Sequence, residues 1–217
     1  PVEGIVFDGI TFTGGDFYAF DTSDIAVSHD WDVVDKPAGL LGIRNASEIT
    51  VKNCKFIKSG GSGIRLDRYA QDITIENNYI EYLGRTGISL IGRGPGYGDV
   101  NNNNTIRGNF IKSIGREKWT SLAILMDQSS NNIVEKNYIE DTYFSAIVIT
   151  APKQFIFMNN RWGTFVGSTW KGRDFHSREF KPSTYNNIPL TPTSAFDNGT
   201  WNAMSHLYSA NNEIINN

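Results

Sequence analysis

Apolar and polar residues alternate in short runs that recur along the chain. Between Leu41 and Ile149 a unit of about 24 to 30 residues repeats, and each unit holds apolar alternations of three to five residues separated by turn residues. No segment shows the sustained apolar stripe of an amphipathic helix. The pattern therefore predicts several short β-strands in each repeat.

Alignment of the units places equivalent residues in columns. A column of small polar residues contains Cys54, Asn78, Asn109, Asn137 and Asn160, and an apolar column two residues later contains Phe56, Ile80, Ile111, Ile139 and Trp162. In a solenoid, equivalent positions stack about 4.8 Å apart, so an asparagine column can form hydrogen bonds from coil to coil. We expect such an asparagine ladder, with Cys54 as a small buried member, and an interior filled by the apolar column.

The turn residues divide each repeat into three short strands, which predicts an all-β, right-handed parallel β-helix with long loop insertions. A β-sandwich is the alternative, but it needs neither a fixed repeat nor a stacked asparagine column. We expect one domain over residues 1–217, incomplete at both ends because the sequence starts and stops within a repeat. Interruptions of the repeat predict insertions at residues 13–40, 92–104 and 163–205. Insertions on a solenoid commonly carry the binding site.

Composition narrows the class of ligand. The formal net charge is -3 and the 20 Lys and Arg residues are scattered, which argues against a nucleic-acid partner. No apolar run long enough to cross a membrane is present, so we expect no membrane partner. The five Trp and nine Tyr, together with many Asn, suit a polysaccharide or oligosaccharide, because sugar rings stack on aromatic rings while hydroxyls bind polar groups.

Two carboxylates are the candidate catalytic residues. The strand alternation points Asp67 and Asp127 outward in one column, two coils apart, together with Arg44, Ile91 and Thr150. Two strand spacings separate their backbones by roughly 9 to 10 Å. This value lies near the upper end of the separation that inverting glycoside hydrolases use. The alternative interpretation is a surface ion pair of Asp67 with a neighbouring arginine.

Four blocks of the sequence resemble a known family. They are Gly4–Gly15, His29–Asp32, Ser59–Asp67 and Gly94–Asn101, and they are similar to bacterial parallel β-helix proteins related to glycoside hydrolase family 141. The resemblance runs from Val2 to Asn217. It implies fucosidase or xylanase activity on plant or algal cell-wall polysaccharide. It also implies secretion to the periplasm, the cell surface or the exterior of a bacterium.

The sequence departs from this family in one respect. The family's catalytic carboxylates lie on later coils, in segments resembling Gly-Asp-Gly-Gly and Leu-Asp-Glu-Gly, which do not occur here. Asp67 and Asp127 are therefore either the acid and base or binding groups. The candidate substrate-binding residues, most of them in the interruptions, are His29, Trp31, Arg65, Asp99, Lys118, Trp119, Trp170 and His176. For Asp99, which follows a glycine-rich turn, we favour binding of main-chain amides.

Two other classes of function remain open. A polysaccharide lyase could use Lys118 and Arg116 beside Trp119, or Arg65 and Arg68, as the base and the group that neutralises the uronate. Only in that case would a calcium ion be expected. A non-catalytic, adhesin-type β-helix would bind glycans through the same loops. The sequence contains no metal-spaced His and Cys cluster and no nucleotide fingerprint, so we expect no cofactor and no resident metal.

Overall fold

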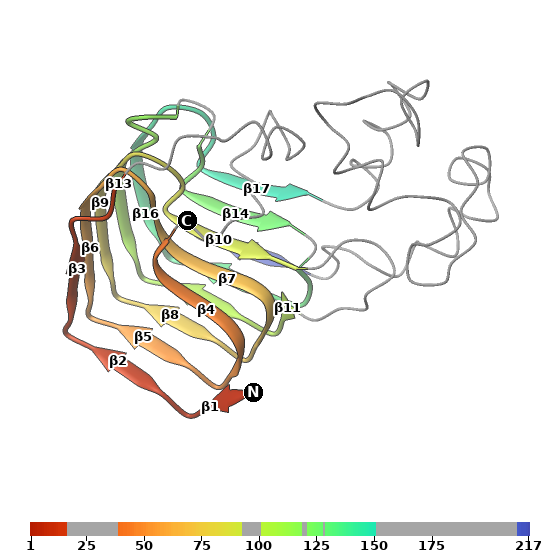
Figure 1. Ribbon diagram of the computed structural model, residues 1–217. Coiled ribbons are helices and arrows are strands. Elements are labelled where there is room, and N and C mark those ends of the chain that lie inside the picture. The colour runs from red at the N-terminus through yellow and green to blue at the C-terminus, as the bar shows by residue number, and fades with distance from the viewer. Residues whose placement is uncertain (17–38, 93–100, 119–120, 128, 151–211) are drawn as a thin grey trace, which may run out of the picture.

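The computed structural model describes residues 1–16, 39–92, 101–118, 121–127, 129–150 and 212–217. Within these ranges the chain forms only β-strands, and every strand pairing is parallel. The strands belong to three sheets, which form three faces of a solenoid (Figure 1). Each of the first five coils contributes a strand to each of the three sheets, as the repeat predicted. The prediction of a parallel β-helix is thus confirmed.

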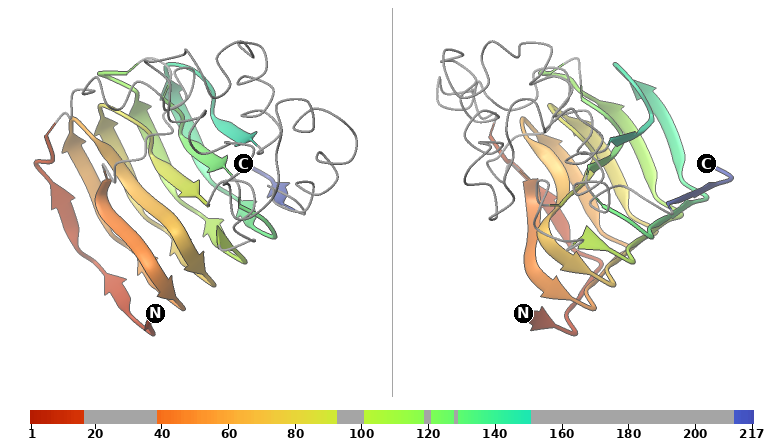
Figure 2. Two further views of the ribbon diagram at one scale, coloured as in Figure 1. Left: turned by 45° about the vertical axis from the view of Figure 1, so that its right-hand side comes forward. Right: turned by 90° about the vertical axis from the view of Figure 1, so that its right-hand side faces the viewer.

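The sheets are named here in the order in which the chain visits them. Sheet A contains β1 (Val2–Glu3), β4 (Gly39–Ser47), β7 (Ser62–Gln71), β10 (Ile88–Ile91), β14 (Ile124–Asp127) and β17 (Ile147–Thr150), and β11 (Asn101–Asn102) also pairs with β7. Sheet B contains β2 (Val6–Asp8), β5 (Thr50–Lys52), β8 (Thr74–Glu76), β12 (Thr105–Arg107), β15 (Ile133–Glu135) and β18 (Glu213–Ile215). Sheet C contains β3 (Thr11–Thr13), β6 (Lys55–Ser59), β9 (Tyr79–Leu83), β13 (Phe110–Ile114) and β16 (Tyr138–Thr142). Figure 2 shows from two further sides that the coils stack in chain order.

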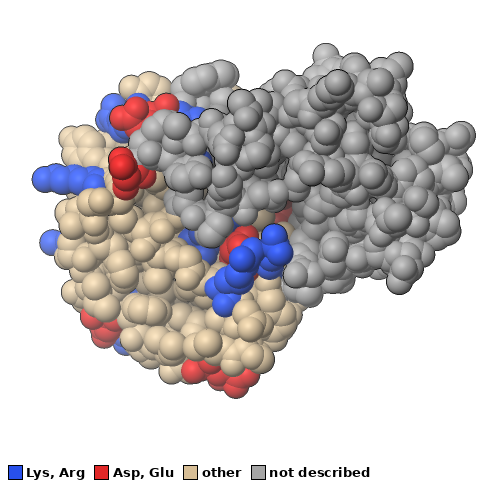
Figure 3. Space-filling view, in the orientation of Figure 1, with Lys and Arg blue, Asp and Glu red and all other residues tan. Residues whose placement is uncertain are grey.

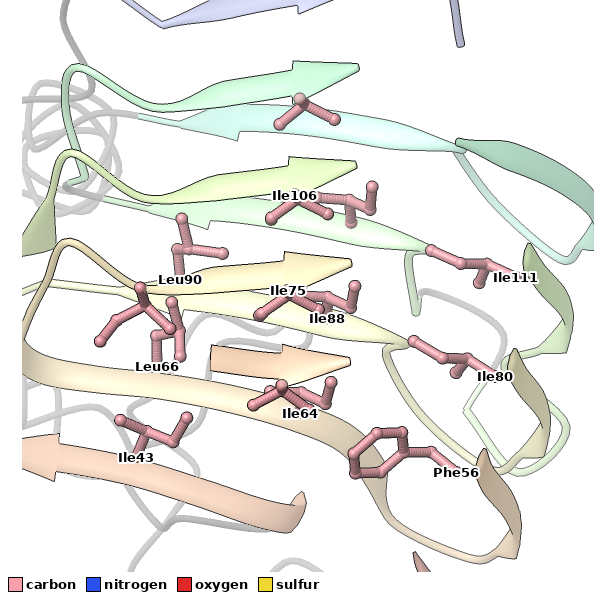
Figure 4. Packing of buried hydrophobic residues seen from close by; sticks show 14 of the residues in the cluster. Ile43, Phe56, Ile64, Leu66, Ile75, Ile80, Ile88, Leu90, Ile106 and Ile111 are labelled. Carbon is pink, nitrogen blue, oxygen red and sulfur yellow. The ribbon is translucent and has the colours of Figure 1, made fainter. Parts of the chain in front are cut away.

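The interior is filled by apolar columns that run from coil to coil. Ile64 and Ile88 are register partners in sheet A, as are Leu66 and Leu90, and all four are fully buried (Figure 4). The columns of the other two sheets meet them from the remaining sides. Among the buried members of these columns are Val51, Ile75, Ile106 and Val134 from sheet B and Phe56, Ile80 and Ile111 from sheet C. The predicted apolar column is confirmed as far as Ile139, while Trp162 lies outside the described residues.

The predicted asparagine ladder is present between sheets B and C. The Oδ1 atom of Asn78 accepts the main-chain N–H of Cys54 at 2.9 Å, and Asn109 Oδ1 accepts that of Asn78 at 3.0 Å. The ladder continues through Asn137, whose main-chain N–H donates to Asn217 Oδ1 at 3.0 Å. Asn217 occupies the next register position, 80 residues after Asn137, and Asn160, which was also predicted for the ladder, lies outside the described residues.

A second ladder lies between sheets A and B and was not predicted. The main-chain N–H of Ile73 donates to Asn104 Oδ1 at 3.0 Å, that of Asn104 to Asn132 Oδ1 at 2.9 Å, and that of Asn132 to Asn212 Oδ1 at 3.0 Å. Because Asn104 belongs to this ladder and β11 pairs with β7, the regular coil resumes at Asn101. This point falls inside the range predicted for the second insertion, residues 92–104. Most of the first predicted insertion and the whole of the third lie outside the described residues.

Candidate functional site

Strand register brings the two candidate carboxylates into one column on sheet A. Asp67 pairs with Ile91 of the next coil, and Ile91 pairs with Asp127 of the coil after it. Arg44 precedes Asp67 in the same column, and Thr150 follows Asp127. The predicted column is therefore confirmed. At the strand spacing of about 4.8 Å, the backbones of Asp67 and Asp127 are about 10 Å apart.

Asp67 is held between two arginines. The Nη2 atom of Arg44 lies 2.9 Å from Asp67 Oδ2, and Nη2 of Arg65 donates to Asp67 Oδ1 at 3.1 Å. The predicted ion pair is thus present, but it is not on the surface as expected, since Asp67 and Arg65 are each only 3% exposed. Both faces of β7 are buried from Ser62 to Asp67, a property that a period-two pattern does not report. Arg44 remains half-exposed.

Asp127 is more deeply placed than Asp67. It is completely buried at the end of β14, and Ile91 between the two carboxylates is 6% exposed. In the view of Figure 3, which has the orientation of Figure 1, Lys and Arg side chains lie next to Asp and Glu side chains on the described surface. The column thus combines a carboxylate bound by two arginines with a second, fully buried carboxylate, and one apolar residue lies between them.

Two of the eight predicted substrate-binding residues, Arg65 and Lys118, belong to the described part of the chain. The other six lie outside the described residues, and their binding roles stay predictions; they are His29, Trp31, Asp99, Trp119, Trp170 and His176. Lys118 lies in the turn between β13 and β14, where its main-chain N–H donates to Gly84 O at 2.9 Å. Its side chain is half-buried. Lys118 therefore belongs to the corner between sheets C and A, and Arg65 belongs to the column of Asp67.

The same corner contains an open hollow that sequence reasoning missed. It has a volume of about 480 Å³ and is lined mainly by Lys58, Gly60, Tyr82, Gly84, Arg116 and Glu117, which come from three successive coils. The Nη2 atom of Arg116 donates to Asp141 Oδ2 at 2.5 Å, and Nη1 donates to Tyr143 Oη at 3.4 Å. No sequence motif marks this group, because its members are about 24 to 35 residues apart and meet only through coil stacking.

The outer face of sheet C carries a stack of aromatic rings beside a row of charges. Tyr79, Phe110 and Tyr138 stack with ring centroids 5.1 and 5.0 Å apart. Next to them, Lys112 Nζ lies 2.7 Å from Glu140 Oε1, and Tyr138 Oη donates to Glu140 Oε2 at 2.7 Å. The hydrogen bond from Lys112 and then that from Tyr138 lower the pKa of Glu140. The hydrogen bond to Glu140 raises the pKa of Lys112.

Neither a metal centre nor a membrane helix is found in the described ranges. Among these residues, no group of three or more His, Cys, Asp or Glu side chains is arranged to hold a metal ion. The calcium ion considered for a lyase therefore stays a prediction. Within the same ranges, no helix is long and apolar enough to cross a membrane.

Comparison with protein families agrees with the coil geometry. A family model described as the right-handed beta helix region matches residues 4–114 and 38–167, which together exceed half of the chain. The chain belongs to the right-handed β-helix family. No curated protein and no solved structure gave a significant match. Membership of this family establishes the fold of the protein. The chemistry of the protein depends on its side chains and does not follow from the fold.

Proposed function

We propose that this β-helix protein is carbohydrate-active and hydrolyses glycosidic bonds, with Asp67 and Asp127 as its pair of carboxylates. The observation that carries the proposal is their shared register position, two coils apart on one face of sheet A. A spacing of about 10 Å between the backbones lies close to the roughly 6.5 to 9.5 Å between the carboxyl groups of inverting enzymes.

The proposal gives the two carboxylates different roles. Asp67 contacts Arg44 at 2.9 Å and Arg65 at 3.1 Å, and in this proposal it is the general base that activates water. In this proposal Asp127 is the general acid that protonates the leaving oxygen. Hydrolysis would then invert the configuration at the anomeric carbon.

The proposed substrate is a plant or algal cell-wall polysaccharide. This choice is supported by the resemblance of the loop blocks to proteins related to glycoside hydrolase family 141. The same resemblance supports a bacterial protein that acts outside the cytoplasm, in the periplasm, at the cell surface or in the medium. The proposal requires no cofactor, because acid and base catalysis by two carboxylates needs only water.

Glycan binding without catalysis is the second candidate function. It is favoured by the engagement of both Asp67 oxygens with arginines, an arrangement that also serves purely to order the strand. A lyase is less well supported, because the guanidinium of Arg116 is bound by Asp141 and Tyr143 rather than presented as a base. Arg65 is likewise bound by Asp67, so such a lyase would depend on Lys118 or Arg68.

The test compares products formed by the full chain and by amide variants. Xylan, fucosylated pectin, alginate and homogalacturonan are incubated with the parent and with Asp67→Asn, Asp127→Asn and Asp8→Asn. Asp8 is an exposed carboxylate on sheet B and serves as the matched control. New reducing ends without the ultraviolet absorbance of unsaturated uronates are expected, with turnover reduced at least about 100-fold in the first two variants.

Each outcome has a distinct meaning. Because Asp67→Asn leaves a buried arginine without its carboxylate, circular dichroism and a melting curve must show that each variant is folded. Unchanged turnover in both Asp67→Asn and Asp127→Asn would remove them as catalysts. Absorbance of unsaturated uronates would assign a lyase. Retained glycan binding without any product would assign the non-catalytic function.

A further inference from the structure

The hollow at the corner between sheets C and A is separate from the carboxylate column. Its lining begins at Lys58 to Gly60, just before β7 starts at Ser62, whereas Asp67 lies five residues farther along that strand. At about 3.3 Å per residue, this separation is roughly 16 Å. A volume of about 480 Å³ lies within the range of roughly 300 to 1,000 Å³ that is typical of small-molecule sites. Any ligand of the hollow is therefore bound away from the proposed catalytic pair.

Tyr82 offers an aromatic surface in this hollow. Its side chain is 50% exposed, and its main-chain φ is +54°, a left-handed conformation that is unfavourable for a bulky residue. The equivalent position in the first coil is Gly14, with φ +77°. Lys58, Ser113 and Asp141 take the same position in their coils with φ between +52° and +56°, so the left-handed turn recurs from coil to coil and is occupied by a tyrosine only in this one.

Arg116 fixes the ring from the side of the next coil. Its guanidinium carbon lies 5.8 Å from the centroid of Tyr82 and 5.5 Å from that of Tyr143. Asp141 and the Tyr143 hydroxyl bind the same guanidinium, so three contacts hold it in place. A surface that is ordered before the ligand arrives loses less conformational entropy on binding. Tyr82 and Arg116 thus form a pre-organised wall of the hollow.

The remaining charges of the hollow are balanced and open to a ligand. Lys58 contributes an ammonium group and Glu117 an exposed carboxylate, and among the described residues neither side chain forms an ion pair. A carboxylate-bearing sugar would be repelled by Glu117, and a cationic ligand by Lys58. Hydroxyl groups, in contrast, can accept from an ammonium group and donate to a carboxylate. The chemistry of the hollow therefore favours an uncharged, hydroxyl-rich ring.

We propose that this hollow binds a pyranose unit of a neutral oligosaccharide. The sugar face stacks on Tyr82, while Lys58 donates hydrogen bonds to the hydroxyls and Glu117 accepts hydrogen bonds from them. The inference rests on the proposed function in one respect, because the ligand is taken to be part of the same class of polysaccharide. It differs from that function because the hollow binds the sugar without cleaving it.

Isothermal titration calorimetry with xylohexaose and cellohexaose tests the proposal, with trigalacturonate as the acidic comparison. The titrations use the full chain with the Asp127→Asn substitution, so that the oligosaccharide is not cleaved during the measurement. We expect a neutral oligosaccharide to bind more tightly than trigalacturonate. We expect Tyr82→Gly and Glu117→Gln to lower its affinity about tenfold each. Tyr82→Gly is chosen because glycine fits the positive φ, so a folding defect is avoided.

Tyr138→Ala is the matched control. Tyr138 is a 55% exposed tyrosine of the same sheet that does not line the hollow, and its loss is expected to leave the affinity unchanged. Equal affinity of the parent and Tyr82→Gly would overturn the proposal, as would stronger binding of trigalacturonate that depends on Lys58. Binding to the inactive Asp127→Asn variant that weakens when Tyr82 is replaced by glycine supports the second site independently of catalysis. Turnover without binding at the hollow would leave the hydrolase standing and remove this inference.

Discussion

Asn137 Oδ1 accepts two hydrogen bonds from Asn109, one from its main-chain N–H at 3.0 Å and one from its side-chain amide at 2.9 Å. Asn109 repeats this arrangement toward Asn78, and its amide also donates to Ile75 O at 3.0 Å. Each asparagine of the ladder thus satisfies buried main-chain groups that no strand partner reaches. The ladder stabilises the tight turns between sheets B and C.

Replacing Asn109 by alanine therefore leaves several buried polar groups without partners. The N–H of Asn78 loses its acceptor, and the carbonyl of Ile75 loses a donor. An unsatisfied buried group costs about 1 to 3 kcal/mol, so we expect Asn109→Ala to lower the free energy of unfolding by about 3 kcal/mol. Urea denaturation measures this change. The exposed Lys55→Ala serves as the control, and an equal loss in both variants would contradict the role of the ladder.

Gly63 lies at a point of close approach between coils. A Cβ atom at this position would lie 2.5 Å from the main-chain oxygen of Gly87, which cannot move without shifting the next coil. We expect Gly63→Ala to cost about 1 to 3 kcal/mol, measured by thermal unfolding. Gly42→Ala on the neighbouring strand is the matched control, because its Cβ would meet no heavy atom within 4 Å. A similar loss at Gly42 would contradict the clash as the cause, because removing the backbone freedom of a strand glycine should by itself be stabilising.

The buried pair of Arg65 and Asp67 should be far more sensitive than the outer pair of Arg44 and Asp67. The side chains of Arg65 and Asp67 are each 4% exposed, whereas that of Arg44 is 46% exposed. We expect Arg65→Met to cost about 3 kcal/mol, because it leaves a buried charge with one partner fewer. Arg44→Met should cost less than about 1 kcal/mol, since water screens that contact. Chemical denaturation of both variants measures the two losses of unfolding free energy. Equal losses would show that burial does not make the Arg65 contact more important than the Arg44 contact.

The charge pair on sheet C predicts a titration at each end of the pH scale. Glu140 has a pKa below its ordinary 4.5, so its contribution to stability is complete above pH 4.5 and is lost as the pH falls through the lowered pKa. Lys112 has a pKa above 10.5, and its contribution is lost as the pH rises through that raised pKa. NMR titration of the Glu140 carboxyl should give a midpoint below 4.5. Lys112→Met should move this midpoint upward, while Lys55→Met should leave it unchanged.

Features that repeat by column could be predicted from the sequence. The asparagines at 78, 109 and 137 recur at the same point of each repeat, and the register that they imply also placed Asp67 and Asp127 in one column. The second ladder was missed because the positions equivalent to Asn104 in earlier coils are Ile49 and Ile73, which make that column look apolar. A column that holds both isoleucines and asparagines cannot be recognised as a polar ladder before the register of the coils is known.

Features that depend on three-dimensional coverage could not be predicted. The period-two alternation predicts correctly that Arg65 and Asp67 point to the opposite face of the strand from the core residues. It carries no information about whether that outer face is itself buried, as it is here. The hollow around Tyr82 was missed for a related reason. Tyr82 has a positive φ at a bulge, where the strand alternation breaks, and its partner Arg116 comes from the next coil.

The ladder step from Asn137 to Asn217 has a consequence for how the solenoid assembles. Earlier steps join residues 24, 31 and 28 positions apart, whereas this step joins residues 80 apart. Because the entropy of loop closure grows only with the logarithm of length, closing 80 residues costs about 1 kcal/mol more than closing 28. The equilibrium penalty is small, but long-range contacts form slowly. The short-period coils are therefore expected to form first and to serve as the template onto which β18 is added last.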